Sequence, residues 1–164
     1  MRGVRVATPA DVEAVVAVVN AAYNKAESFF TDELRTDAVE VSELVGRGEF
    51  LVVDGAAGPA GAVHVQAEAQ RGHFGMLAVA PSAQGAGLGR MLVDAAEAYC
   101  AERGCSEIHL EAVDARVELP RWYERLGYVA YGTVPYVRPE EQMKMPVCFV
   151  LMAKRLPVRA ARDA

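Results

Sequence analysis

The chain has 164 residues, 52% of them hydrophobic and 24% charged, which suits one compact domain over residues 1–156 followed by a short flexible tail at 157–164. Its net charge of −5 argues against a nucleic-acid partner, because phosphate binding relies on clustered lysine and arginine. No apolar run reaches the roughly 18 residues of a membrane span and no signal peptide is recognisable, so we expect no membrane partner.

The first third of the chain predicts a strand and two helices. Residues 3–8 form the strand, and Thr8 is a plausible N-cap for a helix over residues 8–23. Apolar residues spaced three or four apart give that helix one buried face: Val12, Val15, Val16, Val19 and Tyr23. Residues 24–36 show no clear period, and a second helix follows over 37–48.

The middle of the chain predicts three strands, a helix and a further strand. β-rich runs at residues 49–54, 62–69 and 72–80 are joined by short links, which is typical of an antiparallel meander. Period-3.6 spacing then predicts a helix over 88–104, and alternation predicts a strand over 106–115. A strand, helix and strand in this order require a crossover, so we expect the strands before and after the helix to pair in parallel.

A short helix at 118–127 and strands at 128–137 and 146–156 complete the order. The fold class is therefore α/β (α+β), with a mixed, mostly antiparallel sheet of about seven strands flanked by about four helices. The final strands are exposed enough for a homodimer to be reasonable.

Glycines alternate at Gly85, Gly87 and Gly89, where the helix at 88–104 begins. Glycine costs helical stability, but it lets a ligand approach the unpaired N–H groups of a helix start, which favour anions. A mononucleotide loop would need Gly-Lys-Ser/Thr, and a dinucleotide loop would need a glycine at position 90, where Arg90 stands. The remaining alternatives are a phosphate site of another kind and a plain loop with helix-packing glycines.

The stretch "LAVAPSAQGAGLGRMLVDAAE" resembles the signature of the GNAT superfamily of acyl-CoA-dependent N-acyltransferases. Their motif is Gln/Arg-x-x-Gly-x-Gly/Ala after a strand, and Gln84, Gly87 and Gly89 fill it. "LEAVDARVELPRWYERLGYV" is similar to the family's later strand and helix, and "FVLMAKRL" resembles its last strand. The resemblance extends from Val4 to Leu156.

By this resemblance the co-substrate is acetyl-CoA. The two middle strands, 73–80 and 106–113, are expected to splay apart at the centre of the sheet and leave a cleft for it. Main-chain groups of Leu77, Ala78 and Val79 would hydrogen-bond the pantetheine arm, although the same stretch also reads as a plain buried strand. The motif residue Gln84 belongs to the cofactor site, and the backbone amides of the following loop would hold the pyrophosphate: Gly85, Ala86, Gly87, Leu88, Gly89 and Arg90.

Acyl transfer to an amine needs a base, because a free alkylamine has a pKa of about 10 to 10.5 and is mostly protonated at pH 7. It also needs an acid for the departing thiolate and a donor for the oxyanion. The resemblance makes Tyr123 the acid, since many relatives carry there the tyrosine that protonates the sulfur. The alternative for Tyr123 is a core aromatic whose hydroxyl bonds to the backbone.

For the base, some relatives place a glutamate at the position of Glu111. His73 is the rival, because others carry a glutamate base there and an imidazole titrates near neutral pH. Water alone is the third possibility, in which case Glu111 would be solvated or paired with Arg116. His64 and His109 are expected to cap or to face solvent.

Arg116 departs from the family pattern, since several relatives have there an asparagine that contacts the cofactor. It would meet an acidic group of the substrate or pair with Glu118. The three cysteines form no CxxC pair and predict reduced thiols in a cytoplasmic protein, away from the cleft. We therefore expect no acyl-cysteine route, and no metal.

The resulting interpretation is an N-acetyltransferase that uses direct attack in a ternary complex on a primary amine of a small molecule or peptide. The alternatives are an acyl-CoA-binding protein without turnover and an acyltransferase that acts on a protein N-terminus. Residues 23–36 and 131–145 are expected to line the acceptor channel. The acidic composition mildly favours a polyamine, an aminoglycoside or a basic peptide as acceptor.

Overall fold

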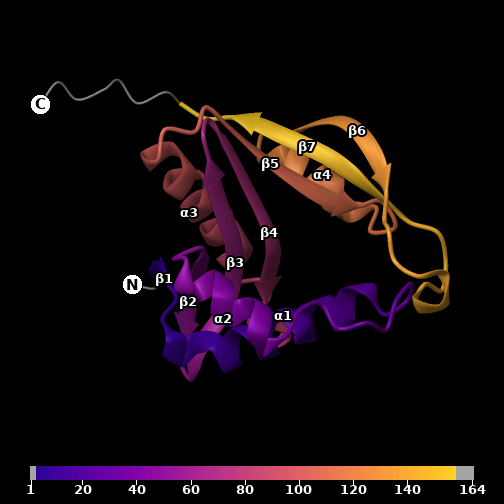
Figure 1. The fold of residues 1–164 in the computed structure, drawn as a ribbon, viewed down its shortest axis with the longest axis horizontal. Coiled ribbons are helices and arrows are strands. Elements are labelled where there is room, and N and C mark those ends of the chain that lie inside the picture. The colour runs from indigo at the N-terminus through magenta and orange to yellow at the C-terminus, as the bar shows by residue number, and fades with distance from the viewer. Residues whose placement is uncertain (1–2, 158–164) are drawn as a thin grey trace, which may run out of the picture.

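A computed structural model describes residues 3–157 of the chain. Seven strands form one sheet in the order β1-β2-β3-β4-β5-β7-β6, and four α-helices flank it (Figure 1). The strands are β1 (Val4–Val6), β2 (Phe50–Gly55), β3 (Gly58–Glu68), β4 (Arg71–Val79), β5 (Glu107–Val113), β6 (Val129–Pro135) and β7 (Cys148–Arg155). The helices are α1 (Val12–Glu27), α2 (Ala38–Gly46), α3 (Leu88–Glu102) and α4 (Glu118–Arg125).

The β4–β5 pair is parallel, whereas every other neighbouring pair in the sheet is antiparallel. This confirms the predicted mixed sheet and the crossover through α3. The pairing covers only Arg71–His73 against Glu107–His109, after which the two strands diverge (Figure 1). The predicted splay at the centre of the sheet is therefore present.

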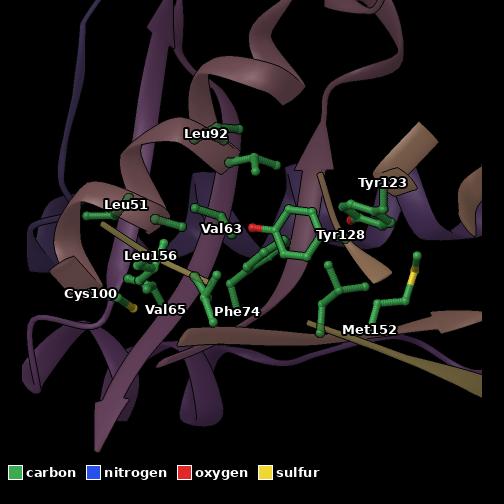
Figure 2. Close-up of a cluster of buried hydrophobic side chains, with 14 of the residues drawn as sticks. Leu51, Val63, Val65, Phe74, Leu92, Cys100, Tyr123, Tyr128, Met152 and Leu156 are labelled. Carbon is green, nitrogen blue, oxygen red and sulfur yellow. The ribbon is translucent and has the colours of Figure 1, made fainter. Parts of the chain in front are cut away.

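Two apolar clusters cover the two faces of the first half of the sheet. Helices α1 and α2 pack on one face, against Phe50 and Val52 of β2, whereas α3 packs on the other, against Leu51 and Val53. Helix α4 joins this second cluster beside β5 and β6. Alternate residues of a strand point to opposite faces of the sheet. Because helices cover both faces of β2, all of its first four residues are apolar. Figure 2 shows part of the second cluster, which includes Phe74, Tyr123, Tyr128 and Met152.

Some strands and helices begin or end at other residues than predicted, because local backbone geometry sets their bounds. Helix α1 follows a 3-10 turn at Pro9–Asp11 and runs on to Glu27, four residues beyond the predicted end. Its fully buried face is Val15, Val18, Val19 and Ala22, while Val12, Val16 and Tyr23 are only partly buried. Strand β3 begins at Gly58 rather than 62, because the positive φ of Gly58 (110°) closes a tighter turn after Gly55.

The solvent-facing prediction for His64 and His109 is wrong. His109 is 9% exposed, and its ring nitrogens lie 2.9 Å from Glu107 and 2.9 Å from both Arg71 and Tyr131. Polar side chains from β4, β5 and β6 surround it, so this histidine is buried although it was expected to face solvent. His64 lies 3.0 Å from Glu49 with a side chain only 14% exposed.

Residues 158–164 of the predicted tail lie outside the described residues. Within residues 3–157 no helix has both the length and the apolar character needed to cross a membrane.

Gly72 of β4 lies directly against Cys100 of α3. A Cβ at this position would lie 2.5 Å from Cys100 Sγ and 2.9 Å from Cys100 Cβ. We expect Gly72→Ala to lower the free energy of unfolding by about 1–3 kcal/mol, because overpacking displaces the helix. Thermal unfolding would measure it.

Gly132→Ala is the matched control in another strand, because its added Cβ would meet Leu151 at an ordinary 3.9 Å. Equal melting temperatures for the two variants would contradict the close packing of β4 on α3.

Candidate active site

A cavity of about 760 Å³ opens where β4 and β5 diverge. Residues of α1, β4, β5, α4, β6 and β7 line it, so every layer of the fold contributes to its walls. The volume lies in the range of small-molecule and cofactor pockets. Eight predicted site residues line the cavity: His73, Leu77, Ala78, Val79, Gln84, Gly89, Glu111 and Tyr123.

His73 and Glu111, which the sequence offered as alternative candidates for the base, form a hydrogen-bonded pair. His73 Nε2 lies 2.6 Å from Glu111 Oε2, and the two side chains are 36% and 40% exposed. His73 is the last β4 residue paired with β5, and Glu111 stands two residues beyond its partner His109, so both side chains reach into the fork. The hydrogen bond from His73 lowers the pKa of Glu111, against the opposing effect of burial.

The alternative pairing of Glu111 with Arg116 does not occur. Arg116 lies 3.5 Å from Glu27 and 3.4 Å from Glu118, and it lines the cavity near the end of α1. The predicted pairing with Glu118 is therefore confirmed, and Glu27 is a second partner that the sequence did not indicate.

Tyr123 projects from α4 into the apolar wall of the cavity. It is 5% exposed, and its ring lies 6.0 Å from Phe74, 4.9 Å from Trp122 and 5.8 Å from Tyr128, measured between centroids (Figure 2). Within residues 3–157 its hydroxyl has no protein hydrogen-bond partner, so the alternative of a backbone-bonded core tyrosine is not what the structure shows. Burial raises the pKa of Tyr123, which therefore keeps its proton to high pH.

Strand β4 offers an open backbone edge to the cavity. Beyond His73 it has no β5 partner, and Leu77, Ala78 and Val79 line the cavity there. A bulge opposite Ala62 and His64 inserts an extra residue, and Met76 takes a positive φ of 49°. Bulges of this kind redirect the strand and are common beside active sites. The free N–H and C=O groups suit an extended ligand that pairs as a strand would.

The glycine loop lies at the end of this edge, where α3 begins. Gly85 and Gly87 have positive φ values of 88° and 77°, and a Cβ at either would meet nothing within 4 Å. Gly87 is the N-cap of α3 and no side chain among residues 3–157 caps the helix, so its first amides lack a capping partner. Ala86 and Arg90 are exposed, whereas the Leu88 side chain is buried and leaves only its backbone available. The loop fits a pyrophosphate bound by main-chain amides.

Gln84 completes this corner of the cavity. Its side-chain amide donates a 3.2 Å hydrogen bond to the carbonyl of Val79, which fixes the loop to the end of β4. Gly89 does not need a positive φ, and a Cβ there would lie 3.6 Å from Trp122.

The far wall of the cavity comes from the two segments predicted to form the acceptor channel. Tyr23, Glu27 and Arg35 from the first, and Tyr136 and Arg138 from the second, line it. The sequence indicated the segments but not these residues. The i, i+4 spacing of Tyr23 and Glu27 at the end of α1 was the one signal that could have found two of them.

The cysteines lie elsewhere. Cys100 and Cys105 are buried free thiols, and burial raises the pKa of Cys100 to about 12. None of the three cysteines is among the described residues that line the cavity. A thiol that stays protonated is a weak nucleophile, so the site offers no basis for a covalent acyl-cysteine.

Comparison with known proteins assigns the fold. Residues 13–128 match the model of the Acetyltransferase (GNAT) family. The mycothiol acetyltransferase of Gordonia bronchialis is 32% identical in an alignment 142 residues long that covers 80% of this chain and 44% of that protein, so the match spans less than half the length of this curated relative.

Two solved structures share the fold at low identity. The YncA protein of Salmonella typhimurium, solved with its cofactor acetyl-CoA, superposes with a TM-score of 0.77 at 19% identity and covers 100% of this chain and 99% of its own. A phosphinothricin acetyltransferase from Sinorhizobium meliloti, in complex with acetyl-CoA, gives 0.75 at 16% identity over 99% of this chain and 92% of its own. With its family match, its splayed sheet and its glycine loop, the chain belongs to the GNAT family of acetyltransferases, enzymes that take acetyl-CoA as co-substrate.

Proposed function

We propose that this enzyme moves the acetyl group of acetyl-CoA to a primary amine of a small molecule or peptide by direct attack in a ternary complex. The observation that carries the proposal is that the His73–Glu111 pair and the Tyr123 hydroxyl line the same cavity as the open edge of β4. This arrangement supports a site in which a proton acceptor and a proton donor would lie beside an extended thioester. The cytoplasmic location and the homodimer stay predictions.

The co-substrate would bind through backbone groups. The edge at Leu77, Ala78 and Val79 would hold the pantetheine arm, and the amides from Gly85 to Arg90 would hold the pyrophosphate. Both sites use only main-chain atoms, so the side chains of β4 stay free to build the core. The bulge at Met76 turns the edge where the thioester would lie.

The reaction needs two protons removed from the acceptor nitrogen and one supplied to the sulfur. The ammonium form of the acceptor gives one proton to the His73–Glu111 pair, and the neutral amine then attacks the thioester carbon, which forms a tetrahedral intermediate. The C–S bond then breaks as the sulfur takes a proton from the Tyr123 hydroxyl, and the second proton of the nitrogen returns to the Tyr123 phenolate. Because burial raises the pKa of Tyr123, the phenol is protonated at neutral pH, as this role requires.

The relatives do not fix the acceptor. The two relatives are named for different compounds, mycothiol and phosphinothricin, and the Gordonia bronchialis protein is more than twice as long as the part that matches. The activity is tested directly by offering a series of amines together with acetyl-CoA and measuring the release of free thiol. Tight binding of acetyl-CoA with no amine accepted would favour the alternative of an acyl-CoA-binding protein without turnover.

Tyr123→Phe tests the acid. We expect kcat to fall by about 10²-fold or more, because general acid catalysis contributes that much and only the hydroxyl is removed. The melting temperature should not change, since the hydroxyl has no protein partner among the described residues. An unchanged kcat in a folded variant would remove Tyr123 from the mechanism.

His73→Ala tests the base through its pH dependence. The hydrogen bond from His73 holds the pKa of Glu111 below its usual value, so its loss lets that pKa rise. The base form of a carboxylate exists above its pKa, and the acid limb of kcat/KM should therefore move to higher pH. Glu111→Gln should lose activity at every pH. If neither variant changed the pH profile of kcat/KM, the base would be water.

Gly89→Ala tests the pyrophosphate site. Its φ is not positive and the new methyl would make an ordinary 3.6 Å contact with Trp122, so the fold should tolerate it. The methyl would, however, lie at the start of α3, among the amides proposed for the diphosphate. We expect the KM for acetyl-CoA to rise about tenfold, a loss of roughly 1.4 kcal/mol.

Gly46→Ala is the control, because a Cβ there meets nothing within 4 Å and lies far from the loop in sequence. A KM for acetyl-CoA that is the same in both variants would contradict the assignment of the loop.

A further inference from the structure

Two arginines stand at the acceptor end of the cavity without a carboxylate partner. Arg35 comes from the loop between α1 and α2, and Arg138 from the loop after β6. Both line the main cavity, and both also line a small adjoining pocket of about 10 Å³. Each is half-buried, and neither makes an ion pair with any of residues 3–157.

Each guanidinium is held instead by an aromatic ring. The Arg35 guanidinium carbon lies 5.4 Å from the centroid of Tyr23, and that of Arg138 lies 5.5 Å from the centroid of Tyr136. Arg138 Nε also donates a 3.0 Å hydrogen bond to the Tyr136 hydroxyl. Contact with an aromatic ring restrains a guanidinium while its remaining N–H groups stay free for a planar anion.

The carboxylates that face this end do not neutralise it. Glu27 is buried beside Arg116, and burial raises its pKa although Arg116, Arg35 and Arg138 all oppose that rise. Glu33 lines the adjoining pocket but is exposed and makes no ion pair in the part of the chain that the structure describes. Arg116 is paired with both Glu27 and Glu118, whereas Arg35 and Arg138 have no carboxylate within ion-pair distance among residues 3–157.

We propose that Arg35 and Arg138 bind a carboxylate of the acceptor, so that the substrate is a small molecule of the amino-acid type. The inference rests on the proposed function and deepens it, because the amine would lie toward His73 and Glu111 while the acid group lies toward the arginines. Half-buried charges without a partner are unfavourable, and a carboxylate accepts two parallel hydrogen bonds from an arginine fork. The carboxylate of the acceptor thus supplies the negative charge that neither arginine finds in the described part of the chain.

Tyr23 connects the two ends of the site. Arg35 packs on its ring, and the phenol lies near enough to Tyr123 to add to the effect of burial in raising the pKa of that residue. A molecule held by Arg35 is therefore beside the wall that carries the proposed acid. A polyamine or aminoglycoside, which the acidic composition of the chain favoured, would bring further positive charge to this wall.

The experiment compares acids with their uncharged counterparts. The proteinogenic L-amino acids and their carboxamides are offered with acetyl-CoA, and thiol release is followed. We expect at least one acid to be acetylated with a kcat/KM at least about tenfold above that of its carboxamide, which keeps the amine and loses the charge.

Arg35→Gln and Arg138→Gln should each lower kcat/KM for that acid about tenfold or more, mainly through KM. Neither variant should change kcat/KM for the carboxamide or the KM for acetyl-CoA. Arg103→Gln is the matched control, since Arg103 also packs over a tyrosine, 3.4 Å from the centroid of Tyr99, but does not line the cavity. Its kinetics should equal those of the wild type.

The outcomes separate the two proposals. If carboxamides or polyamines are acetylated as well as the acids, and the arginine variants affect all amines alike, the carboxylate site is overturned while the acetyltransferase proposal stands. If no amine of any kind is acetylated, the proposed function fails and the site is tested by binding. N-acetyl amino acids with coenzyme A should then raise the melting temperature of the wild type but not of Arg138→Gln, and the absence of any shift would overturn it.

Discussion

The site depends on one interruption of backbone pairing. β4 and β5 share only Arg71–His73 against Glu107–His109, and beyond this point the two strands separate. An unpaired strand edge exposes a row of polar backbone groups that must find partners. In this fold that edge borders a cavity, so the same loss of sheet hydrogen bonding leaves backbone groups available at the proposed cofactor site.

The fork places the side chains proposed for catalysis as well as the cavity. At the last paired residue the strands are still close enough for two side chains to meet, and His73 and Glu111 do so at 2.6 Å. Further along β4 the gap widens, and the wall is closed by Tyr123 from α4 and Tyr23 from α1. The residues proposed as proton acceptor and proton donor therefore come from different layers of the fold and line one cavity at its centre.

Charge is distributed unevenly between the surface and this site. The chain carries a net charge of −5, yet three arginines surround the acceptor end of the cavity. A whole-chain charge reports long-range steering and solubility, whereas a half-buried pocket is governed by the few groups within hydrogen-bond reach. For this reason the composition favoured a basic acceptor and the local geometry favours an acidic one.

The sequence by itself determined the order of elements, the mixed sheet, the family motif with Gln84, Gly87 and Gly89, and the candidacy of His73, Glu111 and Tyr123. These follow from short-range causes, namely period-2 and period-3.6 patterning, turn residues and glycine spacing, which act within a few residues of the chain. Only the tertiary structure decided that His73 and Glu111 are partners, that His109 is buried, and that Arg35 and Arg138 share a cavity. Those contacts join segments 22 to more than 100 residues apart, and their register depends on the splay of the sheet, which no local pattern encodes.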